Sequence, residues 1–137
     1  MVLTFSINGG DFVNAGKASS KVKTVLKQLN IDSEKIKRAV ISLYEAEVNV
    51  AAHASSGTIS VDIDSTSVRM KVDDKGPGIA DIELAMSDGY STASEEVREM
   101  GFGAGMGLPN IKRNSDTLKI ESSPGKGTTV IMEIKLD

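Results

Sequence analysis

The segment DSEKIKRAVISLYEAEVNVAAHA, residues 32–54, carries the strongest helix pattern in the chain and limits the folds open to it. Asp32 or Ser33 can cap the first turn, and Glu34 places a negative charge near the positive end of the helix dipole. A short polar run with a glycine, residues 55–57, ends the helix. The architecture must therefore accommodate one long helix between the segments that flank it.

Strand and helix patterns on both sides of this helix favour one architecture. An alternating run at 3–7 predicts a strand, and apolar positions at helical spacing predict a helix that starts at Asp11 or Asn14 and ends near Asn30. The other patterns predict strands at 58–63, 67–74, 117–122 and 128–134, and short helices at 80–87 and 108–115. Strands at both ends with helices grouped between them favour a two-layer α/β sandwich over a doubly wound parallel sheet.

Length and composition exclude several classes of function. The 137 residues are expected to form a single domain, 1–137, that buries a stable core without disulfides. There is no cysteine, no apolar run near the length of a membrane span and no secretory leader pattern, so we expect a cytoplasmic protein without a membrane partner. A net charge of −3, with two Tyr, three Phe and no Trp, argues against a nucleic-acid partner.

Three polar residues of the long helix, Glu45, Asn49 and His53, follow one another at intervals of four. At about 100° per residue each lies about 40° from the previous one, so they form one stripe. The carboxylate can orient or deprotonate a hydroxyl, and the amide oxygen suits Mg²⁺. Glu47 lies on the opposite side of the helix. Spacing alone favours the alternative, a solvated polar stripe.

The segment VDDKGPGI, residues 72–79, ends a predicted strand with two acidic residues and continues with glycines. A carboxylate such as Asp74 at a strand end can accept a hydrogen bond from an exocyclic amine. Gly76 and Gly78 would let the backbone pass close to the ring that carries the amine. Taken alone, the segment is more typical of an ordinary turn.

The segment EMGFGAGMGLPNI, residues 99–111, has a glycine at every second position from 101 to 107, immediately before a predicted helix. Glycines permit positive φ angles and leave room for a ligand, and free N–H groups at a helix start favour an anion. The Walker and dinucleotide patterns are absent, so neither a P-loop nor a Rossmann site is expected. The segment would be a hinge followed by a phosphate cradle at 105–108, and the alternative is a loop without a ligand.

The segment SPGKGTTVIMEI, residues 123–134, predicts a tight turn at Gly125 and Gly127 followed by a strand. Thr128 and Thr129 point to opposite faces of that strand, so only one of them can reach a pocket. In isolation the segment is typical of a hairpin turn that leads into a core strand.

These segments, in this order, resemble the histidine-kinase-like ATPase superfamily, the Bergerat fold shared by gyrase, Hsp90-type chaperones, mismatch-repair ATPases and sensor kinases. The resemblance covers about residues 35–134. YEAEVNVAAH, VDDKGPGI, GFGAGMGLPNIKR and GKGTTVIMEI are most similar to the small bacterial anti-sigma-factor and serine-kinase branch, especially the stress-response switch kinases. The resemblance implies a mixed, mostly antiparallel sheet covered on one face by helices, with ATP and Mg²⁺ as ligands.

The resemblance also implies a role for each matching residue. Glu45 would be the general base, and Asn49 would bind Mg²⁺ and, through it, the ATP phosphates. Asp74 would hydrogen-bond the adenine amino group, supported by Thr128, with Thr129 as second choice. The implied ATP-binding set is Asn49, His53, Asp74, Gly76, Gly78, Ile79, Gly101, Gly103, Ala104, Gly105, Met106, Gly107, Leu108 and Thr128.

Residues 88–104 would form the ATP lid. For four other residues the role in ATP binding has an alternative interpretation. Arg98 lies near the lid glycines but out of register with the arginine that some anti-sigma kinases place against the γ-phosphate. His53 matches a histidine of some relatives, or is a partly exposed residue at a helix end. Lys112 and Arg113 could sense phosphate or belong to a solvated helix face.

The chain shows neither a phosphoacceptor helical hairpin nor a gyrase-type transducer domain. The resemblance therefore implies a stand-alone serine/threonine protein kinase that phosphorylates a small partner of the sulfate-transporter/anti-sigma-antagonist type. One alternative is a nucleotide-gated protein that captures a sigma factor or another regulator without kinase activity. Another is an α/β domain without a nucleotide site. A homodimer is also open, because anti-sigma relatives often dimerise.

Overall fold

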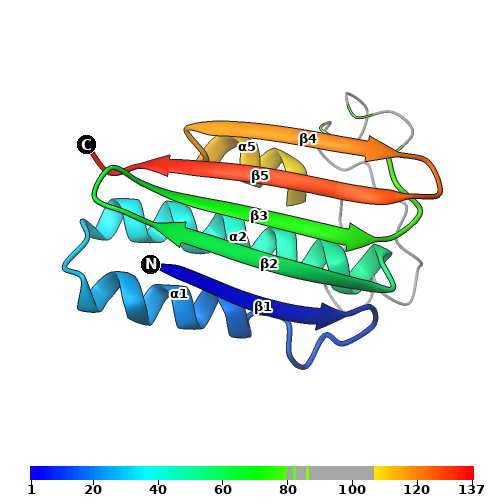
Figure 1. Ribbon diagram of the computed structural model, residues 1–137, viewed down its shortest axis with the longest axis horizontal. Helices are drawn as coiled ribbons and strands as arrows, with labels where there is room; N and C mark the ends of the chain where they lie inside the picture. Colours follow the sequence, from blue (N-terminus) through cyan, green and yellow to red (C-terminus); the bar gives the residue numbers. More distant parts are fainter. Residues whose placement is uncertain (80–81, 83–85, 87–106) are drawn as a thin grey trace.

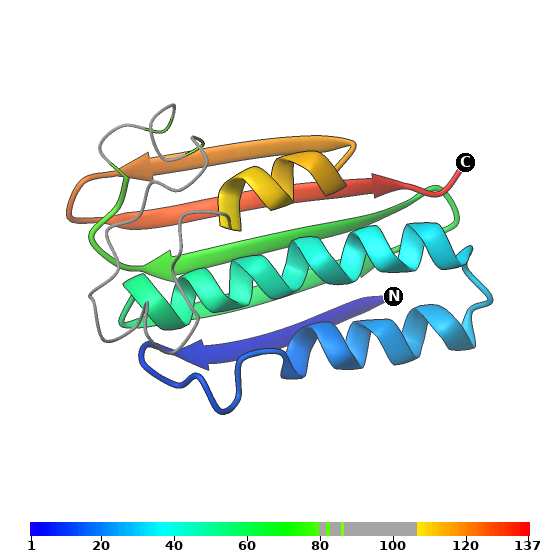
Figure 2. The ribbon, with the colours of Figure 1, turned by 180° about the vertical axis from the view of Figure 1, so that it is seen from behind.

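The computed structural model describes residues 1–79, 82, 86 and 107–137. Its elements are β1 (Val2–Asn8), α1 (Lys17–Gln28), α2 (Ser33–His53), β2 (Ser56–Ile63), β3 (Ser67–Lys75), α5 (Gly107–Asn114), β4 (Thr117–Ser123) and β5 (Gly127–Lys135). The strands form one sheet in the order β1-β2-β3-β5-β4. Figures 1 and 2 show α1, α2 and α5 against the same face of this sheet. The predicted two-layer α/β fold is confirmed, with antiparallel pairing at each of the four described strand contacts.

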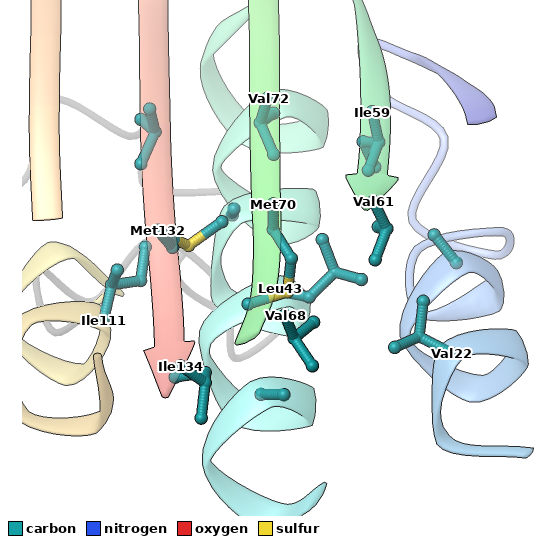
Figure 3. Packing of buried hydrophobic residues seen from close by; sticks show 14 of the residues in the cluster. Val22, Leu43, Ile59, Val61, Val68, Met70, Val72, Ile111, Met132 and Ile134 are labelled. Atoms are coloured by element: carbon teal, nitrogen blue, oxygen red, sulfur yellow. The ribbon is translucent and has the colours of Figure 1, made fainter. Parts of the chain in front are cut away.

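The covered face of the sheet carries the core. Side chains at every second position of β2, such as Ile59 and Val61, are buried, and those between them are exposed or half-buried. A strand with one face on a core and one toward water requires this period. Figure 3 shows Met70 and Met132 from neighbouring strands pointing toward the helices, with Leu43 of α2 beside them.

Helix α1 begins at Lys17, later than the predicted start at Asp11 or Asn14, so that prediction is wrong. The backbone N–H and the side-chain amide of Asn14 both donate to the carboxylate of Asp11. Gly16 then has a φ of 104°, a left-handed conformation that a helix interior does not allow. Asp11 and Asn14 thus stabilise a turn before the helix, which is the local alternative that short polar side chains offer to the backbone.

A buried carboxylate from α2 caps α1. Glu47 Oε2 accepts hydrogen bonds from the N–H groups of Gly16 at 2.8 Å and Ala18 at 3.3 Å, and its Oε1 accepts one from Ser19 at 2.8 Å. The first N–H groups of a helix have no partner within it, and a negative charge there also favours the dipole. Glu47 therefore joins α1 to α2 and satisfies its own charge in the core.

The predicted boundaries of α2 and of the β2–β3 hairpin are confirmed to within two residues. The carboxylate of Asp32 accepts from two N–H groups in the first turn of α2, and Asn30 before it has a φ of 56°, which ends α1. In the hairpin, Asp64 Oδ1 accepts from the N–H groups of Thr66 and Ser67. Short polar side chains thus define both chain reversals.

Two further expectations concern helices. Helix α5 lies one residue before its predicted position at 108–115, and the predicted helix at 80–87 lies outside the described residues, apart from 82 and 86. In the described part of the chain, every helix is too short or too polar to pass through a lipid bilayer.

Candidate functional site

Several predicted site residues in the described part of the chain lie at one end of the sheet. Figure 1 shows that α2 ends at the edge of the sheet where β3 ends and β5 begins. The register places Asp73 opposite Thr129 and Ser122 opposite Thr128. Residues far apart in the sequence thus come together because β3, β4 and α2 end, and β5 begins, at the same end of the sheet.

Asp74 lies on the covered face at the end of β3, and its Oδ1 accepts the N–H of Thr128 at 3.0 Å. Burial raises the pKa of this carboxyl, and the neighbouring charge of Asp73 adds to the rise. The N–H donors of Thr128 and Gly76 act in the opposite direction. The carboxylate is therefore both oriented by backbone groups and partly removed from water.

The two threonines separate as alternation predicts. Thr128 follows Asp74 on the covered face, whereas the hydroxyl of Thr129 donates to Asp73 on the uncovered face. The structure brings the first choice, Thr128, to Asp74 and leaves Thr129 on the other side of the sheet. The direct link runs through the Thr128 backbone N–H, and the Thr128 hydroxyl has a different partner.

That partner is Ser122 of β4, to which no sequence pattern pointed. Its Oγ lies 2.9 Å from the hydroxyl of Thr128, accepts the N–H of Ile79 at 2.7 Å and donates to the carbonyl of Gly127 at 3.1 Å. A serine in a strand carries no functional signal of its own. Only the pairing of Ser122 with Thr128 across β4 and β5 could have indicated it.

Gly78 is required by the protein's own packing. Its φ is +76°, and a Cβ atom built there would lie 2.2 Å from the carbonyl oxygen of Ser123. Pro77 beside it accepts the N–H of Gly125 at 2.7 Å, so the segment that leaves β3 is attached to the β4–β5 turn. The glycine pattern in VDDKGPGI therefore has a structural cause, namely the close approach of two chain segments.

The polar stripe of α2 is half-buried along its whole length, and no side chain in it is fully solvated. Asn110 of α5 donates from Nδ2 to Glu45 Oε1 over 3.5 Å. Burial raises the pKa of Glu45, and the bond from Asn110 partly offsets the rise. Burial lowers the pKa of His53, which keeps this imidazole neutral near pH 7. The stripe thus combines a basic carboxylate, an amide and a neutral imidazole.

Gly107 starts α5 directly against Asn49. A Cβ atom on Gly107 would lie 2.8 Å from Asn49 Oδ1 and 3.1 Å from its Nδ2, so the helix start lies over this amide. Leu108 is partly buried and packs against the core. The lid at 88–104 and the other predicted residues of the glycine segment lie outside the described residues, namely Arg98, Gly101, Gly103, Ala104, Gly105 and Met106.

The two basic residues of α5 differ in their surroundings. Lys112 and Arg113 are both exposed, but Arg113 donates from Nη1 to Asn110 Oδ1 at 3.0 Å. Because the amide oxygen of Asn110 is engaged by Arg113, its NH₂ group faces Glu45. Arg113 thus reaches the polar stripe through Asn110.

A hollow of about 630 Å³ lies at the same end of the sheet. Asp74 and Thr128 line it from the covered face, and Asp73 and Thr129 line it from the other. Glu45, Asn49 and His53 do not line it. The hollow is thus lined by residues at the strand ends, and the polar stripe of α2 is not part of its lining.

Residues 31–137 match the family described as histidine kinase-, DNA gyrase B-, and HSP90-like ATPase. The match spans more than half of the 137 residues, and the chain therefore belongs to this family. The family that the four sequence segments imply is confirmed.

Relatives place the chain in the expected branch. The anti-sigma F factor of a Thermoanaerobacter species is 37% identical over 100 residues, which are 73% of this chain but only 62% of that protein. Serine/threonine-protein kinase RsbT of Bacillus subtilis is 30% identical over 112 residues, 79% of this chain and 78% of that protein. A crystal structure of the RsbU and RsbW domains of a Mycobacterium tuberculosis protein shares the fold, with a TM-score of 0.64 at 15% identity, over 98% of this chain and 32% of that one.

Proposed function

We propose that this protein is a serine/threonine protein kinase of the anti-sigma regulatory type, which uses Mg²⁺-ATP to phosphorylate a small antagonist protein. The names of its relatives, anti-sigma F factor and serine/threonine-protein kinase, support this class. The observation that carries the proposal is the pair Glu45 and Asn49, which are half-buried one turn apart on α2, with the start of α5 packed against Asn49.

In this proposal the base of ATP lies beside Asp74 and its phosphates lie toward Asn49 and the start of α5. Asp74 is held by the Thr128 N–H, so its carboxylate has a defined direction in which to accept the adenine amino group. A hydrogen bond is stronger in such a partly buried position than in water. N–H groups at the start of α5 are suited to an anionic phosphate.

Asn49 fits a Mg²⁺ ion that arrives with the nucleotide. Within the described ranges, no group of three or more His, Asp or Glu side chains gathers into a metal cage. Mg²⁺ usually takes one or two protein oxygens and completes its shell with water and phosphate oxygens, so one amide oxygen is a suitable ligand. When bound, the ion would neutralise charge on the phosphoryl group that is transferred.

Glu45 is the proposed general base. It orients the hydroxyl of a serine or threonine of the partner and accepts its proton while the hydroxyl oxygen bonds to the γ-phosphorus. The bond from the γ-phosphorus to the bridging oxygen breaks, and ADP leaves with that oxygen. Burial raises the pKa of Glu45, which makes it a stronger base than an exposed carboxylate.

Label transfer from γ-labelled ATP to proteins that co-purify with the chain tests the kinase activity. Glu45→Gln keeps the side-chain shape but cannot accept the proton, so transfer should fall by about 100-fold or more. Calorimetry should show ATP binding within a few-fold of the wild type. The matched control is Glu34→Gln, about three turns away on the same helix. Undiminished transfer by Glu45→Gln would remove this residue from its proposed role.

The name of the anti-sigma F factor relatives favours a second candidate, a nucleotide-gated protein that captures a sigma factor or another regulator. ATP-dependent capture without label on any protein would favour this candidate over the kinase. A homodimer stays a prediction, which sedimentation of the free and ATP-bound protein would test.

A further inference from the structure

The hydroxyl of Ser122 has three hydrogen-bond partners, and their chemistry determines where each proton lies. The Ile79 N–H at 2.7 Å can only donate, and the Gly127 carbonyl at 3.1 Å can only accept. The Thr128 hydroxyl at 2.9 Å can do either. A serine hydroxyl has one proton and two lone pairs.

All three bonds form together in only one arrangement. Ser122 donates its single O–H hydrogen bond to the carbonyl of Gly127. It accepts one hydrogen bond from the Ile79 N–H and one from the Thr128 hydroxyl. The proton of Thr128 therefore points at Ser122, away from the rest of the site. What Thr128 presents elsewhere is an oxygen lone pair, which is a hydrogen-bond acceptor.

The neighbouring group on the covered face is also an acceptor. Asp74 is a carboxylate whose Oδ1 takes the Thr128 N–H, so the same residue that shows a lone pair also orients the acid. Two acceptors side by side favour a ligand edge that donates. They disfavour an edge with a carbonyl oxygen, because two oxygen atoms would then face each other without a proton.

We propose that Ser122 determines base specificity: it accepts the hydrogen bond of the Thr128 hydroxyl, so that Thr128 and Asp74 both present acceptors to the base, and thereby selects a purine with a 6-amino group over one with a 6-oxo group. This inference rests on the proposed function, because it assumes that a nucleotide base lies beside Asp74. Ser122 itself does not touch the base. It is a positioning residue that acts through Thr128.

The test measures dissociation constants of Mg²⁺-ATP and Mg²⁺-GTP by calorimetry. The wild type should prefer ATP. In Ser122→Ala the Thr128 hydroxyl can turn its hydrogen toward a 6-oxo group and donate to it. The ratio of ATP to GTP affinity should therefore fall about tenfold, which corresponds to the net free energy of one hydrogen bond. Ser122→Thr keeps the hydroxyl and should keep the ratio. The matched control is Ser123→Ala, because Ser123 is exposed on the other face of the same strand.

Amide hydrogen exchange provides a readout that needs no nucleotide. The Ile79 amide should exchange faster in Ser122→Ala and remain protected in Ser123→Ala. An unchanged ATP-to-GTP ratio in a folded Ser122→Ala protein with faster Ile79 exchange would overturn the inference and leave the proposed function standing. A wild type that binds neither nucleotide would overturn both.

Thr128→Val is a second variant that keeps the inference testable if Ser122→Ala does not fold. Thr128→Val removes the hydroxyl through which Ser122 acts, so it should itself lower the ratio, and adding Ser122→Ala should change the ratio no further. A ratio that stays at the wild-type value in Thr128→Val, or a further fall in the double mutant, would contradict the inference.

Discussion

The amide of Asn110 on α5 donates to the carboxylate of Glu45 on α2 over 3.5 Å, while its oxygen accepts from Arg113 at 3.0 Å. The proposed base is thus oriented by a helix that begins at Gly107, beside Asn49. The position of α5 therefore affects both residues of the polar stripe that the proposed mechanism uses.

Replacing Asn110 should make Glu45 more basic. Burial raises the pKa of Glu45 and the Asn110 bond lowers it, so Asn110→Ala should raise it further. A carboxyl whose folded pKa is raised favours the folded state most below its unfolded pKa, and this contribution is lost as pH rises through the folded pKa. NMR titration of the Glu45 carboxyl measures the shift, with Asn114→Ala as a control on the same helix. A pKa that falls or stays constant in Asn110→Ala would contradict the assigned bond.

Replacing Glu47 should destabilise the fold. The wild-type carboxylate accepts hydrogen bonds from backbone N–H groups at both oxygens. In Glu47→Gln the side-chain NH₂ group replaces one of these oxygens and must face an N–H group, which leaves a buried donor unpaired. The free energy of unfolding should fall by about 1–3 kcal/mol. Urea unfolding measures the change, and Glu34→Gln near the start of α2 is the control. Equal stability of the two variants would show that Glu47 does not hold α1.

Replacing Gly107 should strain the contact with Asn49. The new Cβ in Gly107→Ala would lie 2.8 Å from Asn49 Oδ1, so the side chain or the helix must shift. Such overpacking costs about 1–3 kcal/mol. If Asn49 is the obstacle, Gly107→Ala should cost less stability in an Asn49→Ala background, as a double-mutant cycle of urea unfolding would show. An equal cost in both backgrounds would place the obstacle elsewhere.

Asp116 should stabilise the fold at neutral pH and lose this effect in acid. The N–H of Lys135 and the guanidinium of Arg38 hold the pKa of Asp116 below its usual range. A depressed pKa contributes stability above the unfolded pKa, and this is lost as pH falls through the folded value. Asp116→Asn should therefore lose stability at neutral pH and depend less on pH below 4 or so. Thermal unfolding from neutral to acidic pH measures this, with Asp62→Asn, an exposed residue of β2, as the control. An acid-range slope identical to that of the wild type would contradict it.

Local signals predicted most of the fold. The strands and α2 follow from periodicity, and Asp32 and Asn30 mark boundaries because their effects extend over only a few residues. The start of α1 was misplaced because Asp11 and Asn14 resemble helix caps but bond to each other in a turn. Burial of Glu47 could not be foreseen, because its partners lie about 30 residues away in sequence.

The site was predicted in part for the same reason. Alternation separates Thr128 from Thr129, and the spacing of Glu45 and Asn49 places them on one face of a helix. Ser122 and Asn110 carry no local pattern that marks them. Their roles depend on strand register and on helix packing, which only the folded chain determines.

The hydrogen bond from Ile79 to Ser122 and the close packing of Gly107 against Asn49 have a consequence for how this protein could diverge. Ile79 and Gly107, the described residues on either side of positions 80–106, are thus held by contacts within the folded body itself. Sequence variation that keeps these two contacts would therefore leave the ends of β3 and α5 in place.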